Sequence, residues 1–560
     1  ISGRIKEYTY DSLGRVALVC KHNGDNTLFI NYKRDLAGRV LEESKTDASG
    51  NLLYQISYSY DSDGNIGSIT RYIDGAPSVN NYTYDAFNRL INHKDPYGNT
   101  TTRSYDENFI NEKGQKVLQI KKTDPAKGVL IETWNSLNRL VKKETKQDNS
   151  LSSCEFIFDP HGNLIVQKDH VYRDGEFLNT QSITNTYTPN HQLESFSQGN
   201  FKTLFTYTPA GRIATRTLPD KTLLSYKYDS LGFLSEISSS DNKIRHKFIH
   251  DTFGNLKYAK NETIEINRTL DPFGNVLQET FSPGYTIKKE YDDFNRLTKL
   301  KTPSLGEVAY TYDPLFLRKV TRFDTKGSEL YTHHYKKYDL DGNLVTEHLI
   351  DALGEINHRF NARGQKTDVV SPYFSQNCSY DDRGNLITNK IDDIEVQYTY
   401  DGLAQLISES NTRTHYHYDS VYNRDKVNEA NQLLKNTYDF NGNQAIKEIF
   451  SVKFSLNYDP LNRLTEATST NKKISFSYDP LGRRLSRKVN IMTSSGWQEK
   501  ESELYLYDGF NEIGTFSNGQ LLNFKVIGLN TIAVELGNQI FVPIVDVQDN
   551  IRRLIATNSG

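Results

Sequence analysis

The chain repeats a pattern in which two aromatic residues, separated by one position, precede a polar turn and an aliphatic residue follows it. Tyr58 and Tyr60 precede the turn at 61–64, and Ile66 follows it. A spacing of two places both rings on one face of a β-strand. The same pairs recur as Tyr8 and Tyr10, Tyr82 and Tyr84, Tyr226 and Tyr228, Tyr310 and Tyr312, Tyr398 and Tyr400, Tyr416 and Tyr418, and Tyr505 and Tyr507. The pattern predicts antiparallel strands in which rings of successive repeats stack beside each other across a sheet.

The turn itself has a constant chemistry. An Asp opens it, and the third residue after the Asp is Gly or Asn, as in Asp61 with Gly64 and Asp85 with Asn88. Only these two residue types commonly accept a left-handed backbone. The Asp can accept hydrogen bonds from N–H groups two residues further on. The sequence therefore predicts a type I turn followed by a left-handed residue, which closes a β-hairpin with a G1 bulge.

The predicted structural turn residues are Asp11 and Gly14, Asp61 and Gly64, Asp85 and Asn88, Asp159 and Gly162, Asp251 and Gly254, Asp292 and Asn295, Asp381 and Gly384, Asp459 and Asn462, and Asp479 and Gly482. In five degenerate copies another residue stands at the left-handed position: Phe109, His191, Phe316, Ala404 and Tyr422. We expect those turns to be longer, strained or lost.

The repeat period decides the architecture. Asp381, Asp401, Asp439, Asp459 and Asp479 mark a period near 20 residues. Two strands per repeat give on the order of 45–50 strands, and a flat sheet of that width is not viable because such sheets curl or close beyond about ten strands. We therefore expect an all-β fold in which antiparallel β-hairpin repeats wind spirally into a hollow shell. A parallel β-helix is a weaker alternative, since it has no hairpin turns.

Composition agrees with a thin wall. Hydrophobic residues make up only 36% of the 560 residues, which is low for a thick core, whereas 12% aromatic residues are too many for a disordered chain. Ile1 opens the sequence and Met492 is its one methionine, so we expect these residues to be a piece of a longer polypeptide.

The residues that could carry chemistry are sparse. Lys and Arg number 67 and Asp and Glu 70, spread evenly for a net charge of −3, so the sequence predicts no nucleic-acid partner. The three cysteines fit neither a disulfide framework nor a metal knuckle. His415 and His417 share a strand face but have no third ligand at readable spacing. No catalytic or phosphate-binding motif is present. We therefore predict no catalytic residue, no metal site, no cofactor and no enzymatic activity.

The segments YDSLGRV (10–16), YDSDGNI (60–66), YDDRGNL (380–386) and YDPLGRRL (478–485), with YLYDGFNEIGTFSNGQ at 505–520, resemble the Rhs/YD-repeat family. That family includes bacterial Rhs polymorphic toxins, the C component of insecticidal toxin complexes, wall-associated proteins and teneurins. The resemblance covers nearly all of the chain. It implies a YD shell over residues 1–504, followed at 505–560 by the beginning of the Rhs-associated core.

The resemblance further implies a bacterial secreted or cell-surface protein whose shell encloses its own C-terminal toxin domain as cargo. A second protein that completes the shell or delivers it is an additional partner. The family's aspartate-dependent cleavage motif is absent, and Asp-Pro pairs such as Asp459-Pro460 and Asp479-Pro480 lie in repeat turns. The alternative function is a cell-surface adhesion or carbohydrate-binding scaffold. The Val-, Ile- and Leu-rich segment 521–545 is either a plug for the shell or simply the last strands on a better-filled core.

Overall fold

The computed structural model describes residues 6–23, 26–282, 284–412, 414–424, 426–537 and 539–557. These residues form 47 β-strands in two sheets of 36 and 11 strands. Within the described ranges no α-helix occurs, and so none that is long and apolar enough to cross a bilayer. The protein is all-β.

The first sheet consists of β1 (Lys6–Tyr10), β2 (Val16–Asn23), β3 (Asn26–Arg34), β4 (Val40–Thr46), β5 (Leu52–Tyr60), β6 (Ile66–Ile73), β7 (Ala76–Tyr84), β8 (Leu90–Lys94), β9 (Thr100–Ile110), β10 (Lys116–Thr123), β11 (Val129–Trp134), β12 (Leu140–Gln147), β13 (Ser150–Phe158), β14 (Leu164–Arg173), β15 (Glu176–Tyr187), β16 (Leu193–Gln198), β17 (Phe201–Tyr207), β18 (Ile213–Thr217), β19 (Leu223–Tyr228), β20 (Leu234–Ser239), β21 (Arg245–His250), β22 (Leu256–Lys260), β23 (Glu265–Leu270), β24 (Val276–Phe281), β25 (Tyr285–Tyr291), β26 (Leu297–Thr302), β27 (Gly306–Tyr312), β28 (Leu317–Phe323), β29 (Glu329–Tyr338), β30 (Leu344–His348), β31 (Glu355–Phe360), β32 (Lys366–Ser371), β33 (Phe374–Tyr380), β34 (Leu386–Ile391), β35 (Ile394–Tyr400) and β36 (Leu406–Glu409). The second sheet consists of β37 (Ile446–Ile449), β38 (Val452–Tyr458), β39 (Leu464–Thr468), β40 (Lys472–Tyr478), β41 (Arg484–Thr493), β42 (Gly496–Asp508), β43 (Asn511–Ser517), β44 (Gln520–Ile527), β45 (Thr531–Leu536), β46 (Gln539–Val545) and β47 (Ile551–Ala556).

Each strand pairs antiparallel with its neighbours in the sequence, so both sheets are long meanders. In β5 and β6, for example, Tyr58 lies opposite Ile69 and Tyr60 opposite Ile66, with a bulge just before Tyr60. The same bulge precedes the turn in most repeats. The wall is therefore built from hairpins, as the turn chemistry predicts.

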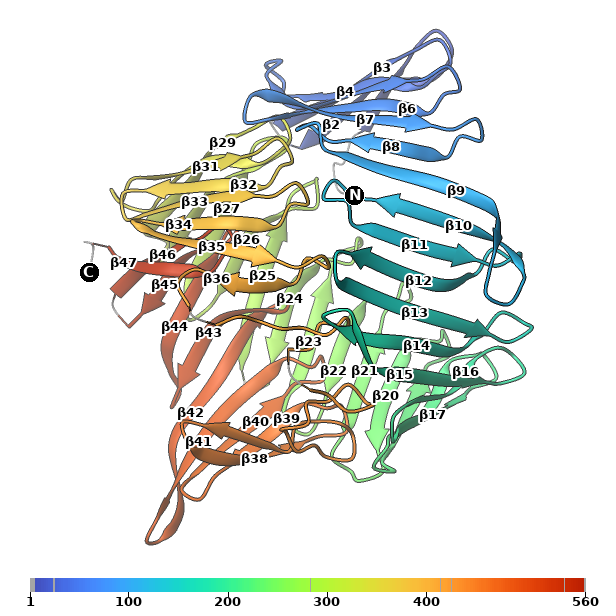
Figure 1. Cartoon of the computed structure of the whole chain (residues 1–560). Helices are drawn as coiled ribbons and strands as arrows, with labels where there is room; N and C mark the ends of the chain where they lie inside the picture. Colours follow the sequence, from blue (N-terminus) through green and yellow to red (C-terminus); the bar gives the residue numbers. More distant parts are fainter. Residues whose placement is uncertain are drawn as a thin grey trace.

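The meander winds into a spiral (Figure 1). We call β1–β24 the first coil, β25–β36 with the turns up to residue 443 the second coil, and β37–β47 the third coil. Turns of the second coil lie on the opposite hairpin ends of the first coil. These contacts join residues 221 to 286 positions apart: Asn23 with Asp292, Asn26 with Tyr312, Asp74 with Asp339, Ser78 with Ala362, Asp95 with Arg363, Tyr172 with Ser420, Gln181 with Asn431, and Asp220 with Asn441. The spiral thus closes along its side, and the all-β hairpin shell is confirmed.

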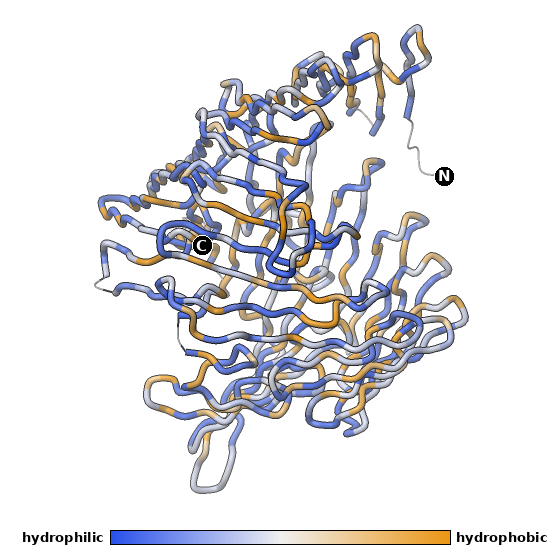
Figure 2. The backbone as a smooth tube through the Cα atoms, turned by 45° about the vertical axis from the view of Figure 1, so that its right-hand side comes forward, coloured by the Kyte–Doolittle hydropathy of each residue, from blue (hydrophilic) through white to orange (hydrophobic). Residues whose placement is uncertain are grey.

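The buried core is unevenly distributed. In the first coil most strands are half-exposed on both faces, and hydrophobic and hydrophilic residues alternate along the tube (Figure 2). The large apolar cluster lies where the third coil packs against β22–β33. Its fully buried members include Ile266, Ile287, Val308, Val320, Tyr335, Ile356 and Val369 on one side, and Phe524, Val526, Ile532, Ala533, Val542 and Ile544 on the other. One part of the wall is therefore two layers thick.

In the C-terminal third, one predicted strand is largely missing and one predicted domain boundary is not tested. Between Glu409 and Ile446 the turns persist, but the expected strand at Tyr416 and Tyr418 is reduced to isolated bridges such as Ser408 with His415. The legs between turns are too short there to form full ladders. The predicted boundary at 504/505 falls within β42 and stays a prediction, and the chain ends at residues 1 and 560 lie outside the described residues.

Candidate functional site

The repeat turn is a small network built around one carboxylate. At Asp61, Oδ1 accepts the backbone N–H of Asp63 at 3.0 Å and of Asn65 at 2.9 Å, and Oδ2 accepts the Asn65 side-chain amide at 3.1 Å. The Gly64 N–H donates to the Asp61 carbonyl at 3.2 Å, and Gly64 has φ 91°. The hydrogen bond from Asn65 is the main reason that the pKa of Asp61 lies below its ordinary value. The charged Asp therefore stabilises the turn.

The other turns named from the sequence have the same left-handed backbone. The φ values are 74° at Gly14, 60° at Asn88, 101° at Gly162, 88° at Gly254, 69° at Asn295, 92° at Gly384, 60° at Asn462 and 88° at Gly482. In each, the Asp carboxylate accepts the N–H four residues on: Asp11 from Arg15, Asp85 from Arg89, Asp159 from Asn163, Asp251 from Asn255, Asp292 from Arg296, Asp381 from Asn385, Asp459 from Arg463 and Asp479 from Arg483.

The five degenerate copies behave in three ways. His191, Ala404 and Tyr422 keep the turn with φ of 62°, 62° and 70°, so these side chains occupy a backbone region that costs about 1–2 kcal/mol. Phe316 lies in a tighter turn, in which the Asp313 N–H donates to the Phe316 carbonyl. Phe109 lies within β9, so no turn forms there.

An arginine or asparagine four residues after the Asp completes the motif, and the arginine also reaches the next repeat. Arg296 donates from Nε to Asp292 at 2.8 Å and from NH1 to the Asp313 carbonyl at 2.8 Å. Its guanidinium lies over the Tyr312 ring, 4.3 Å from the centroid. The same stacking joins Arg39 to Tyr60, Arg89 to Tyr105, Arg463 to Tyr478 and Arg483 to Tyr507. The prediction of ring beside ring is wrong at these repeats, since a cation lies over the ring. Phe316 and Tyr338 do stack, at 4.2 Å.

The tyrosine at the end of the strand, just before the Asp or Thr position, links the repeats through its hydroxyl. Tyr60 donates to the carbonyl of Val40, the first residue of β4, at 2.8 Å, and Tyr84 donates to Ile66, the first residue of β6, at 3.1 Å. The same bond joins Tyr105 to Leu90, Tyr187 to Leu164, Tyr207 to Leu193, Tyr228 to Ile213, Tyr291 to Val276, Tyr338 to Leu317, Tyr380 to Lys366, Tyr400 to Leu386, Tyr458 to Gln444, Tyr478 to Leu464 and Tyr507 to Arg484. Tyrosine is used because it combines a packing ring with a donor.

A buried ion pair joins the third coil to the second. Arg322 in β28 binds Glu535 in β45 with two hydrogen bonds of 2.8 and 3.1 Å, and Tyr331 donates its hydroxyl to the same carboxylate at 2.6 Å. The Arg322 side chain is 4% exposed and Glu535 is 15% exposed. Burial, followed by the charge of Glu535, raises the pKa of Tyr331. We call Arg322, Tyr331 and Glu535 the seam triad.

The seam also depends on a close approach of backbone to side chain. Tyr335, buried in β29, accepts the Leu529 N–H on its hydroxyl at 2.9 Å. A Cβ added at Gly528 would stand 2.2 Å from that hydroxyl. Only glycine lets the loop between β44 and β45 lie this close to the second coil.

Within the second coil, one carboxylate that is mostly buried lies between two histidines. His333 Nε2 lies 2.9 Å and His358 Nε2 3.0 Å from the oxygens of Glu347. Burial acts to raise the pKa of Glu347, but the hydrogen bonds from the two histidines outweigh it and lower the pKa to about 2. The carboxylate thereby joins β29, β30 and β31 within the second coil.

No protein-family model matches the chain. The chain is 24% identical over 528 residues to the double-stranded DNA deaminase toxin A of Burkholderia cenocepacia. The matched region covers 91% of this chain and 34% of the toxin. It is 25% identical over 219 residues to the tRNA3(Ser)-specific nuclease WapA of Bacillus spizizenii, covering 38% of this chain and 8% of WapA.

Among solved structures, the chain superimposes along its whole length on TcdB2-TccC3 without its hypervariable C-terminal region, with a TM-score of 0.73 and 13% identity. It covers 34% of that chain. The chain therefore spans about a third of the deaminase toxin and of TcdB2-TccC3, and less of WapA. Its YD repeats, its hairpin spiral and these similarities agree with the resemblance to the Rhs/YD-repeat family, and the chain shares the fold of the TcdB2-TccC3 shell.

Proposed function

We propose that the chain forms part of the wall of a container that encloses the C-terminal toxin domain of the same bacterial, secreted or surface polypeptide. The observation that carries the proposal is the continuous contact between coils. Turns of the second coil are hydrogen-bonded to hairpin ends of the first from Asn23 to Asp220, and the seam triad fastens the third coil. In this proposal the chain itself acts by containment and catalyses no reaction.

A wall closed in this way would protect a polypeptide inside it, because a protease needs several residues of extended chain in its cleft. The half-exposed, polar strand faces of the first coil would offer an enclosed chain few apolar sites to bind. Residues 521–545 would seal the wall at the seam, through Phe524, Val526 and Ile544.

The proposal is tested by native-state proteolysis of the complete polypeptide that the gene encodes. We expect the region after the shell to resist thermolysin while the shell is folded, and to be digested when Glu535→Ala opens the seam. The Glu499→Ala variant, which removes an exposed ion pair with Lys488 in the same sheet, serves as the matched control. Free digestion of the C-terminal region in the folded wild-type protein would overturn containment.

The outer turns point to a partner that extends the wall. The residue two positions after the turn Asp is exposed throughout the first coil, for example Leu13 at 64%, Phe87 at 74% and Phe253 at 83%. In the second coil the equivalent Phe294 and Leu315 pack on the apolar cluster of β2 and β3. Because this turn position is covered at Phe294 and Leu315, where another coil lies beside it, we propose that a further hairpin wall covers the exposed row.

Cysteine labelling tests this contact. Phe253→Cys should react rapidly in the isolated 560-residue chain and at least 10-fold more slowly in the complete protein or its assembly. Phe450→Cys, at a 98% exposed position of the hairpin between β37 and β38, should react at the same rate in both. Equal rates at position 253 in the two forms would contradict a covering wall, without bearing on whether cargo is enclosed.

A further inference from the structure

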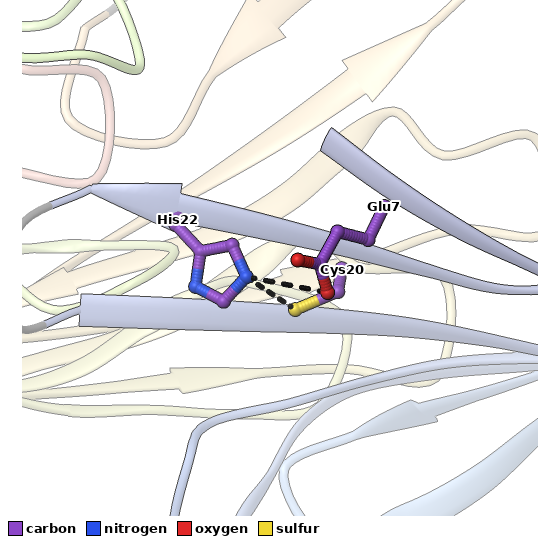
Figure 3. A group of neighbouring side chains, drawn as sticks. All are labelled: Glu7, Cys20 and His22. Atoms are coloured by element: carbon purple, nitrogen blue, oxygen red, sulfur yellow. Dashed lines mark hydrogen bonds and ion pairs between the residues drawn. The ribbon is translucent and has the colours of Figure 1, made fainter. Parts of the chain in front are cut away.

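Three side chains of β1 and β2 converge on one point of the sheet face (Figure 3). Cys20 and His22 are two residues apart on β2 and share a face. Glu7 of β1 lies directly opposite Cys20 in the strand register. Cys20 Sγ is 3.3 Å from His22 Nε2, and that nitrogen is 3.7 Å from Glu7 Oε2. All three ligand atoms lie within 4.8 Å of one another.

These separations can be compared with the edges of a metal tetrahedron. With Zn–S of about 2.3 Å and Zn–N and Zn–O of about 2.1 Å, a tetrahedral ion sets sulfur and nitrogen about 3.6 Å apart and nitrogen and oxygen about 3.4 Å apart. The observed 3.3 and 3.7 Å differ from these edges by about 0.3 Å. The third separation, between Cys20 Sγ and the Glu7 carboxylate, lies within 4.8 Å, and rotation of the exposed Glu7 side chain can shorten it to the ideal edge of about 3.6 Å.

The imidazole is already oriented for ligation. His22 Nδ1 lies 3.2 Å from Thr27 Oγ1, and Thr27 lies directly opposite His22 on β3. When Nδ1 donates its proton to the threonine hydroxyl, Nε2 carries the lone pair that faces Cys20 and Glu7. A hydrogen bond to the outer ring nitrogen is the usual support of a ligating histidine.

The site is open enough for an ion to enter from solvent and for one coordination position to remain free. Cys20 is 6% exposed, His22 is half-buried and Glu7 is exposed. An ion held by the three would rest on the sheet with its fourth position toward solvent, where a water molecule completes the tetrahedron.

We propose that Glu7, Cys20 and His22 bind one divalent transition-metal ion, with Zn²⁺ as the best fit. A thiolate, an imidazole and a carboxylate favour Zn²⁺ over Mg²⁺ or Ca²⁺, which prefer oxygen ligands alone. On binding, the metal–sulfur bond forms and the Cys20 thiol releases its proton to solvent. The ion would clamp β1 to β2 across the sheet.

Metal titration of the purified protein tests the site. With CoCl₂ as the probe, we expect one equivalent to give a thiolate-to-cobalt charge-transfer band and the intense visible bands of tetrahedral Co²⁺, both lost on adding ZnCl₂. Cys20→Ser should abolish the charge-transfer band. Glu7→Gln, at an exposed position that the fold tolerates, should weaken binding at least 10-fold. Thr27→Val should weaken it by about 10- to 100-fold through the orientation of His22.

His170→Ala is the matched control. His170 also lies beside a threonine, Thr180 at 3.1 Å, and a carboxylate, Glu155 at 3.4 Å, but Cys154 is on the neighbouring position of β13 and so on the other face. This variant should bind cobalt like the wild type. A charge-transfer band that is absent from the wild type, or that persists in Cys20→Ser, would overturn the proposal.

Discussion

Removing Glu535 should loosen the third coil more than any exposed substitution in the same sheet. In Glu535→Ala, the Arg322 guanidinium stays buried at 4% exposure without its carboxylate, and the Tyr331 hydroxyl loses its acceptor. Breaking a buried ion pair from one side costs about 3–5 kcal/mol, because the remaining charge is neither solvated nor paired. Glu535 is 15% exposed, so water can partly replace the lost carboxylate. We therefore expect a destabilisation at the lower end of this range, about 3 kcal/mol.

That free energy converts into a rate that can be measured. At about 1.36 kcal/mol per factor of ten, 3 kcal/mol raises the open population of the third coil about 150-fold. Native-state proteolysis with thermolysin, in the regime where cleavage is slow relative to closing, reports that population directly. Glu499→Ala, which removes a pair with both side chains about half exposed, should change the rate less than about threefold.

A compensated variant separates charge from packing. Replacing the whole triad with apolar residues of similar size, by Arg322→Met, Tyr331→Phe and Glu535→Leu together, should restore most of the lost stability. The reasoning is refuted if Glu535→Ala is cleaved no faster than Glu499→Ala. It is equally refuted if the apolar triple variant is as unstable as Glu535→Ala, since the cost would then lie in lost shape and not in an unpaired charge.

Three further changes test other parts of the wall. Gly528→Ala should open the seam in the same proteolysis assay, because its Cβ would meet the Tyr335 hydroxyl at 2.2 Å, and adding Tyr335→Phe should recover part of the loss; no effect of the alanine would refute the close approach. Ala404→Gly relieves a φ of 62° and should raise the free energy of unfolding by about 1 kcal/mol, whereas Ala210→Gly in an ordinary turn backbone should lower it by about 0.5–1 kcal/mol in urea titrations. Because the pKa of Glu347 is depressed to about 2, its contribution, on the order of 3 kcal/mol, is present above about pH 4.5 and is lost as the pH falls towards 2; Glu347→Gln should remove that part of the acid dependence in thermal melts, and an unchanged acid limb would contradict it.

Local features of the fold could be predicted because their causes lie within a few residues. The left-handed backbone at Gly64 and Asn462 follows from residue type alone, and the Asp that supports it is three positions away. The loss of the turn at Phe109 could have been predicted, because Asn111 and Gly114 supply the next turn motif only a few residues later.

For the contacts between repeats, the sequence shows which residues take part but not which partners they contact. The recurrence of Tyr and of Arg or Asn was evident, but their partners lie one repeat away, as for the Tyr60 hydroxyl on Val40 and the Arg296 guanidinium on Tyr312. The pattern shows which residues recur and leaves open whether ring meets ring or cation meets ring. That choice depends on the offset between neighbouring hairpins.

The candidate metal ligands needed the strand register. Cys20 and His22 form a Cys-x-His spacing that could have been noticed, but a search by cysteine-to-cysteine spacing passes over it. Glu7 joins them only because β1 pairs with β2 in one register, which places it opposite Cys20.

What the amino-acid sequence determined by itself is therefore the hairpin, the meander and the necessity of winding, because turn stereochemistry and strand periodicity are local properties. The tertiary structure alone decided how the coils meet. Arg322 and Glu535 are 213 residues apart and are two among many similar charges, so no local pattern pairs them. The pitch of the spiral accumulates from small twists over dozens of strands, and it is this sum that sets which turn lies on which hairpin end.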